Sequence, residues 1–457
     1  MDAKSLIDRD LASVWHPCSQ MSDYQDFPPL PVVSASGCRL RLADGREILD
    51  AISSWWCKSL GHGHPAITAA IRNQLDRFEH VILANTTNEL IVGFAESLLA
   101  MCNAGLEPRG PVGAGAPRSV PFTKVFFTDN GSSGVEVALK MALHWQQLAG
   151  QAQRTRYATL ENGYHGETVG ALSVSDLGLY ADPYRPLLFP TLVMRGLPYR
   201  QGPEDAGWMD ASAEWPGLER QLDAQAETLA AIIYEPVLQA AGGMRLISPD
   251  LLPRLRRWAD AHGVLLIADE VASGMGRCGA MLASHLAVDG MPDLAVVSKG
   301  LTGGSLPLAC VLATQRIYEA FLGTWASRRA FLHSNTYAGN ALAVAAAAAV
   351  LRVVRDEGVC AQATATGARM RAALTSRAHP RLSTVRGVGM VAAVDLLGCE
   401  PAARTGYRVY QEAVRRGALL RPLGDTLYLL PPLHAPWSEV EAMLGILQDS
   451  VATVLSD

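Results

Sequence analysis

The stretch Asp293-Leu-Ala-Val-Val-Ser-Lys-Gly-Leu-Thr-Gly-Gly304 carries a short apolar run that leads directly into a lysine and a glycine-rich turn. Residues 294–297 are short, apolar, rich in β-branched side chains and bounded by chain breakers, which is typical of a buried strand. Lys299 then lies at the carboxyl end of that strand, where open α/β sheets bind their ligands. A lysine in an apolar site can lose its proton and attack a carbonyl to form a Schiff base. A surface lysine in a glycine-rich loop is the alternative.

A second strand upstream adds a carboxylate. Residues 264–268 are apolar and run directly into Asp269 and Glu270, and Lys299 follows Asp269 after 30 residues. That spacing is enough for one crossover back into the same sheet, so both side chains can face one crevice. Pyridoxal phosphate needs such a pair: a lysine for the covalent link and an acid that keeps its ring nitrogen protonated. For Asp269 alone, a helix N-cap is the alternative.

The composition excludes several classes of protein. The 457 residues are enough for two or three domains, and 49% hydrophobic with 18% charged residues can bury a large core. A net charge of −5 without a basic stripe disfavours nucleic acid as a partner. The eight scattered cysteines form no Cys-x-x-Cys or Cys/His cluster, which argues against a metal site and a disulfide framework.

No segment of the sequence indicates secretion or a membrane. The first ten residues contain no apolar core segment, and the alanine-rich run 341–351 is too short to cross a bilayer. We therefore expect a soluble cytoplasmic protein.

Two further turns favour a flat, phosphorylated ligand. The strand 123–127, the turn Thr128-Asp-Asn-Gly-Ser-Ser-Gly134 and a following helix form a phosphate-binding arrangement, because free backbone N–H groups meet the positive end of a helix. Tyr164 and His165 lie between glycines after the strand 157–160, where an aromatic ring can stack on a pyridine. An ordinary strand–helix turn and a turn packed on the core are the respective alternatives.

Strands alternate with helices through much of the chain, which predicts an α/β fold with a mainly parallel sheet and helices on both faces. We expect residues 61–345 to form a large cofactor-binding domain and residues 346–457 a smaller α+β domain, which residues 1–60 join. In the smaller domain we expect helices at 361–377 and 404–416 and strands at 383–386, 390–395 and 427–430.

Loops and turns are predicted elsewhere. Asp44-Gly45 indicates a hairpin. Residues 103–121 and 180–217 are expected to be loops, because they are rich in glycine and proline.

Together these motifs resemble class III aminotransferases, which are pyridoxal-phosphate enzymes of fold type I, and the resemblance covers nearly the whole chain. Within that family the sequence is similar to the biotin-pathway members. The pieces that carry this closer resemblance are Trp15-His-Pro17, Ser53-Ser-Trp-Trp56, Asn162-Gly-Tyr-His-Gly166, Gly274-Met-Gly-Arg277, Ser298-Lys-Gly-Leu-Thr-Gly-Gly304 and Arg421-Pro422.

The resemblance implies roles for individual residues. Lys299 would be the Schiff-base lysine and proton carrier, Asp269 the partner of the ring nitrogen, and Tyr164 the residue that stacks on the ring. The implied cofactor-binding residues are Gly131, Ser132, Ser133, Tyr164, His165, Glu235, Asp269, Lys299, Asn335 and Thr336. The implied substrate-binding residues are Cys18, Trp55, Trp56, Tyr164, Arg277, Lys299, Ser334 and Arg421.

The resemblance also implies the assembly and the environment of the substrate. Thr336 would reach the phosphate of a neighbouring subunit, so we expect a homodimer with active sites at the interface. Arg421 would bind a substrate carboxylate, and Trp55 with Trp56 would form the wall of the pocket. If the two tryptophans lie in a strand, they point to opposite faces and at least one of them is in the core.

The implied reaction is the transamination of 8-amino-7-oxononanoate to 7,8-diaminononanoate, with S-adenosylmethionine as donor. Some members carry a tyrosine after Trp-His-Pro where this chain has Cys18, so the pocket is expected to be roomier there and lysine stays open as a donor. An ω-amino-acid or diamine transaminase on the same scaffold is the alternative function. No Gly-x-Gly-x-x-Gly follows an early strand, which disfavours a nicotinamide-binding protein.

Overall fold

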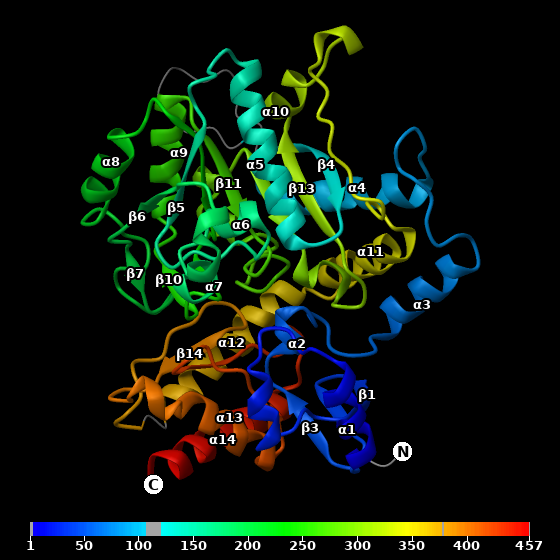
Figure 1. Ribbon diagram of the computed structural model, residues 1–457, viewed down its shortest axis with the longest axis vertical. Coiled ribbons are helices and arrows are strands. Elements are labelled where there is room, and N and C mark those ends of the chain that lie inside the picture. The colour runs from blue at the N-terminus through cyan, green and yellow to red at the C-terminus, as the bar shows by residue number, and fades with distance from the viewer. Residues whose placement is uncertain (1–2, 107–119, 377–378, 457) are drawn as a thin grey trace.

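The computed structural model describes residues 3–106, 120–376 and 379–456. A seven-stranded sheet lies at the centre of the upper lobe in Figure 1, with the strand order β4-β13-β12-β11-β8-β5-β6. Its strands are β4 (Phe122–Thr128), β5 (Arg156–Leu160), β6 (Leu192–Met194), β8 (Leu229–Tyr234), β11 (Leu265–Asp269), β12 (Leu294–Val297) and β13 (Ala309–Thr314). Only β13 runs antiparallel to its neighbours, β12 and β4. The prediction of a mainly parallel sheet is therefore confirmed.

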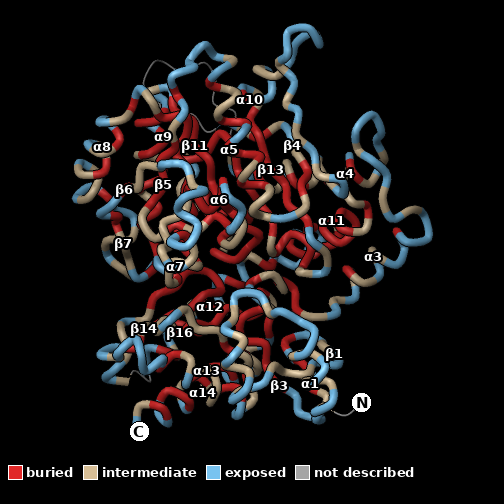
Figure 2. Tube along the Cα trace, viewed as in Figure 1, coloured by how far each residue is buried: buried red, intermediate tan, exposed pale blue. Residues whose placement is uncertain are grey.

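The central strands form because their residues are apolar on both faces. Every residue of β8, β11 and β12 is buried, and Figure 2 shows the chain around β11 largely in red. Strands buried on both faces are expected in a sheet covered by helices on both sides. Buried residues on the two faces of this sheet belong to two separate clusters, and a third, smaller cluster of Leu40, Leu42 and Ile48 lies in the lower lobe. Helix α5 (Gly131–Leu148) packs in one cluster, whereas α4 (Glu89–Cys102), α9 (Leu251–His262) and α11 (Ala341–Asp356) contribute to the other.

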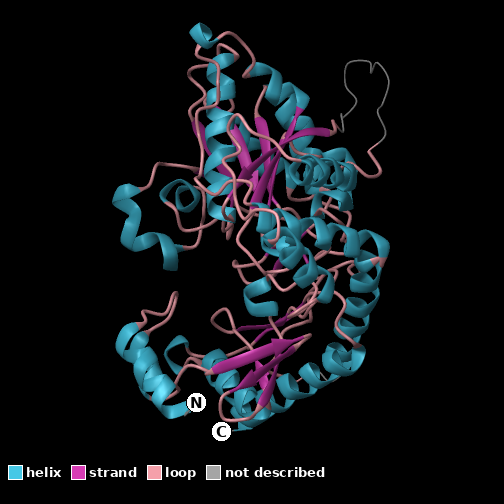
Figure 3. Cartoon of the chain, turned by 90° about the vertical axis from the view of Figure 1, so that its right-hand side faces the viewer, coloured by secondary structure: helices cyan, strands magenta, loops and turns pink. Residues whose placement is uncertain are grey.

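Further helices complete the two lobes. They are α1 (Ala3–Ser13), α2 (Ser53–Trp56), α3 (Pro65–Leu75), α6 (Val169–Ser173), α7 (Gly178–Ala181), α8 (Trp215–Asp223), α10 (Gln315–Ala320), α12 (Val359–Ser376), α13 (Thr405–Arg416) and α14 (Trp437–Ser456). Figure 3 shows the large sheet lying between helices in the upper lobe, and a smaller group of strands beside helices in the lower lobe. Among the described residues, no helix combines the length and apolar character needed to cross a membrane.

The lower lobe combines the two ends of the chain. One sheet has the order β1-β2-β3-β15 and another pairs β14 with β16. These strands are β1 (Val32–Ser36), β2 (Arg39–Leu42), β3 (Glu47–Asp50), β14 (Ala392–Asp395), β15 (Ala418–Leu419) and β16 (Thr426–Leu429). β3 near the N-terminus runs parallel to β15 near the C-terminus, with Leu49 opposite Ala418, and Figure 1 shows blue and orange elements together here. The domain boundaries at residues 60 and 345 stay predictions.

Two local expectations differ from the structure. The segment 180–217, predicted as a loop, contains the edge strand β6 and also β7 (Tyr199–Arg200), which pairs with β10 (Arg245–Ile247), itself paired with β9 (Leu238–Gln239). Residues 383–386 form no strand, because only isolated bridges occur at Leu382 and Arg386.

The hairpin near Asp44-Gly45 joins β2 to β3, and an additional antiparallel pair, β1 with β2, precedes it. The predicted loop 103–121 lies largely outside the described residues.

Candidate active site

A cavity of about 420 Å³ lies at the carboxyl ends of the central strands. The side chains that follow β4, β5, β8, β11 and β12 meet there because these strands run in the same direction. Its lining includes the residues Trp56, Cys57, Asp129, Asn130, Gly131, Ser132, Tyr164, His165, Gly166, Glu235, Asp269, Val271, Ser298, Lys299 and Thr302.

Lys299 begins a short 3-10 turn, η4 (Lys299–Thr302), directly after β12. Its ammonium nitrogen lies 5.1 Å from the centre of the Trp56 ring. Burial lowers the pKa of Lys299, although attraction to the carboxylates of Asp269 and Glu235 acts in the opposite direction. A lysine with a lowered pKa holds more of the neutral amine, which is the nucleophilic form.

Asp269 is held in a fixed position beside the cavity. It ends β11, and its register partner on β12 is Val296, three residues before Lys299. Nδ1 of His165, whose side chain is fully buried, donates to Oδ2 of Asp269 over 2.8 Å. The other carboxylate oxygen accepts the backbone N–H of Val271 over 3.0 Å. These two hydrogen bonds fix the orientation of the carboxylate.

Glu235 and Tyr164 also line the cavity. The carboxyl group of Glu235 accepts the backbone N–H groups of Tyr164 and Ala240, each over 3.0 Å. Burial raises the pKa of Glu235 to about 7. The Tyr164 hydroxyl donates to Glu167 over 2.9 Å. Burial, together with this hydrogen bond, raises the pKa of Tyr164 well above its usual range, so the phenol stays neutral.

The turn before α5 is built for a close approach to an anion. Asn130 caps the helix by accepting the N–H of Ser133 over 3.0 Å, while Gly131 and Ser132 line the cavity. The first N–H groups of a helix have no partner inside it and carry the positive end of the dipole. A Cβ on Gly166, whose φ is +127°, would lie within the Ser132 side chain, so the cradle needs glycine at that position.

A larger pocket of about 1630 Å³ adjoins this cavity and shares Trp56, Ser132, Tyr164 and Lys299 with it. The Arg421 guanidinium stacks over the Trp55 ring at 4.1 Å and donates to the Cys18 carbonyl over 3.2 Å. Arg421 therefore keeps donors available for a ligand in this pocket.

Cys18 borders the same pocket, where its small side chain was expected to leave room. The hydroxyl of Tyr180 on α7 lies 3.8 Å from Cys18 Sγ, so an aromatic side chain from another element borders that space. The Tyr180 ring also lies 5.6 Å from that of Tyr164.

Five of the sequence-predicted residues do not line either pocket. Ser133 lies in the first turn of α5 but not on the cavity wall. Arg277 is buried beneath the site, where it donates to the carbonyls of Met390 and Pro431 over 3.1 and 2.7 Å. Ser334, Asn335 and Thr336 lie on a separate segment, with Ser334 and Thr336 exposed.

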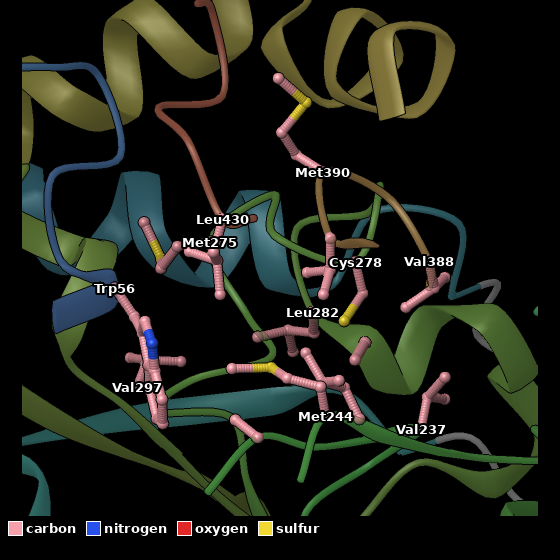
Figure 4. Packing of buried hydrophobic residues seen from close by; sticks show 14 of the residues in the cluster. Trp56, Val237, Met244, Met275, Cys278, Leu282, Val297, Val388, Met390 and Leu430 are labelled. Carbon is pink, nitrogen blue, oxygen red and sulfur yellow. The ribbon is translucent and has the colours of Figure 1, made fainter. Parts of the chain in front are cut away.

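The two tryptophans do not lie in a strand. Residues 53–56 all have φ between 45° and 74°, so they form one left-handed turn. The turn places Trp56 in the buried cluster drawn in Figure 4, with Nε1 donating to the Tyr428 hydroxyl over 3.0 Å. Trp55 stays 39% exposed and faces the larger pocket. The expectation that one tryptophan belongs to the core is confirmed, although the strand behind that expectation is wrong.

Several residues of the site were not predicted. Glu167 and Tyr180 border the larger pocket, and Cys57 borders the cavity around Lys299. Glu167 could have been singled out, because it follows the Gly-Tyr-His-Gly motif by one residue. For Tyr180 the sequence carried no signal, because the segment around it was expected to be an irregular loop.

Comparison with known proteins agrees with this geometry. The family described as "Aminotransferase class-III" matches residues 20–451. A relative from Synechococcus elongatus, adenosylmethionine-8-amino-7-oxononanoate aminotransferase, is 40% identical over 95% of this chain and 97% of its own length. The crystal structure of the protein of that name from Methanocaldococcus jannaschii is 29% identical, covers 99% of both chains and has a TM-score of 0.88.

A second solved structure broadens the comparison. An amine transaminase from an uncultivated Pseudomonas species, in its PLP-bound form, is 33% identical, covers 96% of this chain and 98% of its own, and has a TM-score of 0.86. The predicted fold type I is thereby confirmed. Because the family matches residues 20–451, and the alignments with these two relatives cover 97% and 99% of their lengths, the chain belongs to the class-III aminotransferases.

Proposed function

We propose that the protein transfers an amino group from S-adenosylmethionine to 8-amino-7-oxononanoate, forming 7,8-diaminononanoate for biotin biosynthesis, with pyridoxal phosphate as cofactor. The observation that carries the proposal is the meeting of Lys299 with the Asp269–His165 pair in one cavity, next to a pocket bordered by tryptophan and arginine. The names of the relatives from Synechococcus elongatus and Methanocaldococcus jannaschii support the choice of acceptor.

The cavity residues fit the cofactor. Lys299 would hold it covalently, Asp269 would pair with its ring nitrogen, and the turn at Gly131 and Ser132 would bind its phosphate. Asn335 and Thr336 lie away from this cavity and would act from a neighbouring subunit. When bound, the cofactor supplies an electron sink for the substrate and stores the amino group between the two half-reactions.

The protein's own groups supply the proton transfers. Nζ of Lys299 would take the proton from the donor carbon that bears the amino group, and would carry it between that carbon and the cofactor. The lowered pKa of Lys299 favours this exchange near neutral pH. The buried imidazole of His165 orients Asp269, which would pair with the ring nitrogen of the bound cofactor.

The larger pocket suits both substrates. The stacked guanidinium of Arg421 would bind the carboxylate of the acceptor, since a planar guanidinium can donate two parallel hydrogen bonds. The indoles of Trp55 and Trp56 would contact the alkyl chain of the acceptor and the sulfonium of the donor, because aromatic faces attract both. Cys18 and Tyr180 would border the donor.

We also infer a homodimer with shared sites. The segment that contains Ser334, Asn335 and Thr336 packs beside residues 79–83, where the His80 and Tyr337 rings lie 5.4 Å apart. These segments expose large apolar side chains, namely Val81, Ile82, Leu332 and Tyr337. Exposed apolar side chains gathered in this way are typical of subunit interfaces. Light scattering should give twice the chain mass, and a monomeric active enzyme would contradict the inference.

The location of the protein is inferred from its thiols. All eight cysteines are free, four of them buried, which fits a reducing compartment such as the cytoplasm.

Isotope transfer tests the reaction. The holoenzyme is incubated with 8-amino-7-oxononanoate and S-adenosylmethionine labelled with ¹⁵N at its α-amino group, and the product is analysed by mass spectrometry. We expect 7,8-diaminononanoate that carries the label. Labelled lysine, alanine and a diamine serve as parallel donors. Transfer of the label from lysine alone would show that lysine, and not S-adenosylmethionine, is the amino donor. Preferential transfer from alanine or the diamine would favour an amine transaminase, a function to which the Pseudomonas structure also points.

A further inference from the structure

The turn that carries the two tryptophans needs to be held in place. Four consecutive residues without a glycine, Ser53 to Trp56, adopt the left-handed conformation, with φ of 51°, 45°, 68° and 74°. Side chains disfavour this conformation because Cβ approaches the following carbonyl oxygen. Such backbone persists only where surrounding contacts over-determine it. The contacts at this turn therefore decide where both indoles lie.

A buried carboxylate makes several of those contacts. Asp50, at the end of β3, is fully buried. Its Oδ1 accepts the backbone N–H groups of Ile52 and Ser54 over 3.3 and 2.9 Å. Its Oδ2 accepts the Ser54 hydroxyl over 2.7 Å and Nε2 of His62 over 2.8 Å. Burial alone would raise the pKa of Asp50, but the hydrogen bonds from His62 and Ser54 outweigh burial and lower it.

His62 is itself anchored to a different part of the chain. Its backbone forms an antiparallel bridge with Gly37, in the turn between β1 and β2, with N–O distances of 2.9 and 2.8 Å. Gly61 permits this approach, because a Cβ there would lie 2.9 Å from the Gly37 carbonyl oxygen. The carboxylate of Asp50 thus joins the tryptophan turn to the sheet of the lower lobe.

The other side of the turn faces the reacting groups. Trp55 stacks under Arg421 at 4.1 Å, and the Trp56 ring lies 5.1 Å from Nζ of Lys299. Ser59, just after the turn, donates to the carbonyl of Gly300, the residue that follows Lys299, over 2.9 Å. A displacement of the turn would therefore move the pocket wall, the arginine partner and the neighbourhood of the lysine together.

We propose that Asp50 and His62 are positioning residues: their hydrogen-bonded pair holds the left-handed turn 53–56 and so sets the two indoles for the acceptor chain. This proposal rests on the function proposed above, because the indoles form the wall of that substrate pocket. The two residues that hold the wall in place lie outside the pocket. Neither Asp50 nor His62 lines either pocket.

A double-mutant cycle on the holoenzyme tests the proposal. The variants are Asp50→Ala, the milder Ser54→Ala, Trp55→Ala and the combination of Asp50→Ala with Trp55→Ala. Asp44→Ala is the matched control, because Asp44 makes a similar set of hydrogen bonds, to Arg46, in the exposed turn just before β3. The measurements are KM and kcat for 8-amino-7-oxononanoate, the near-ultraviolet circular dichroism of tryptophan, and the urea midpoint of unfolding.

We expect Asp50→Ala to raise KM at least roughly tenfold, with kcat changed less, and Ser54→Ala to raise KM by a smaller factor in the same direction. Adding Asp50→Ala to Trp55→Ala should raise KM less than twofold further, because the carboxylate acts through the indoles. Asp44→Ala should match the wild-type protein. The proposal would be overturned if the two substitutions raised KM additively. It would also be overturned if KM rose only in proportion to the fall in the urea midpoint.

The circular dichroism needs no substrate, so it separates this proposal from the proposed function. Asp50→Ala and Ser54→Ala should each reduce the tryptophan bands that disappear in Trp55→Phe and Trp56→Phe. If the wild-type enzyme does not convert 8-amino-7-oxononanoate, the proposed function fails while this measurement still tests the positioning role. Unchanged tryptophan bands in Ser54→Ala and Asp50→Ala would show that the pair does not set the indoles. If Asp50→Ala does not fold, Ser54→Ala alone decides between these outcomes.

Discussion

Arg421 is the residue whose replacement should separate substrate binding from chemistry most clearly. Its guanidinium stacks on Trp55 and uses one donor for the Cys18 carbonyl, which leaves further N–H groups for a ligand. A hydrogen bond to a charged group contributes about 1.5–3 kcal/mol. In a pocket open to water we expect Arg421→Ala to cost about 2–3 kcal/mol of acceptor binding, which corresponds to a KM roughly 30- to 150-fold higher.

The value of kcat should change little, because the carboxylate is bound equally in the ground state and the transition state. Arg421→Lys should fall between the wild type and Arg421→Ala, because lysine keeps the charge but loses the planar stack. Steady-state kinetics with saturating donor measures both constants.

Arg404 provides a matched control in the same pocket. It also stacks on an aromatic ring, Tyr407 at 4.3 Å, but both of its terminal nitrogens already bind the carboxylate of Asp23 over 2.9 and 2.7 Å. Arg404→Ala should therefore change the acceptor KM less than roughly threefold, the effect expected of a surface ion pair. Equal effects of Arg404→Ala and Arg421→Ala, or an unchanged KM in Arg421→Ala, would refute the assignment of the carboxylate site.

Three other variants test the centre of the site. Lys299→Ala should abolish turnover and the visible absorbance of the lysine-bound cofactor, as measured by spectrophotometry; survival of either would exclude Lys299 as the covalent partner. Asp269→Asn should change the free energy of unfolding, measured in urea, by no more than about 1 kcal/mol. It should slow the release of deuterium from an α-deuterated donor at least roughly a hundredfold, because a neutral amide cannot keep the ring nitrogen charged. Burial raises the pKa of Glu235 from 4.5 to about 7, so its contribution to stability is present below pH 4.5 and is lost as the pH rises through about 7. Relative to Glu235→Gln, the wild-type unfolding free energy should fall on the order of 3 kcal/mol across that window; a difference that does not change with pH in urea titrations would contradict the raised pKa of Glu235.

The sequence predicted the core of the site because that part depends on local patterns. The strands that end at Asp269 and just before Lys299 are continuous apolar runs, and such runs are read directly as buried strands of a parallel sheet. Their common direction then brings both residues to one edge. The turn at Gly131 was also predicted, although α5 begins within it, at Gly131, because Asn130 supplies the cap.

The tryptophan turn could not be predicted, because no local signal favours a left-handed backbone at two serines and two tryptophans. Its conformation depends on partners far along the chain: Ser53 donates to the Leu430 carbonyl over 2.7 Å, and Asp50 reaches His62. The same reasoning applies to Arg277. Its motif was recognised, but the sequence did not show that its guanidinium binds carbonyls from the C-terminal segment rather than a substrate.

Short edge strands were missed for another reason. β6 has three residues inside a segment rich in proline and glycine, and its assignment depends on pairing with β5. A strand of that length carries too little apolar pattern to be recognised on its own. Tyr180 lies in the same segment, which explains why its place beside Cys18 emerged only from the structure.

The central claim is that this site takes its amino group from S-adenosylmethionine for 8-amino-7-oxononanoate. The most direct measurement mixes the purified yellow holoenzyme with S-adenosylmethionine alone and records the visible absorbance, with lysine, alanine and a diamine in parallel. Our account predicts that only S-adenosylmethionine removes the yellow absorbance and that 8-amino-7-oxononanoate then restores it. Loss of the yellow absorbance with alanine or the diamine, and not with S-adenosylmethionine, would contradict the account.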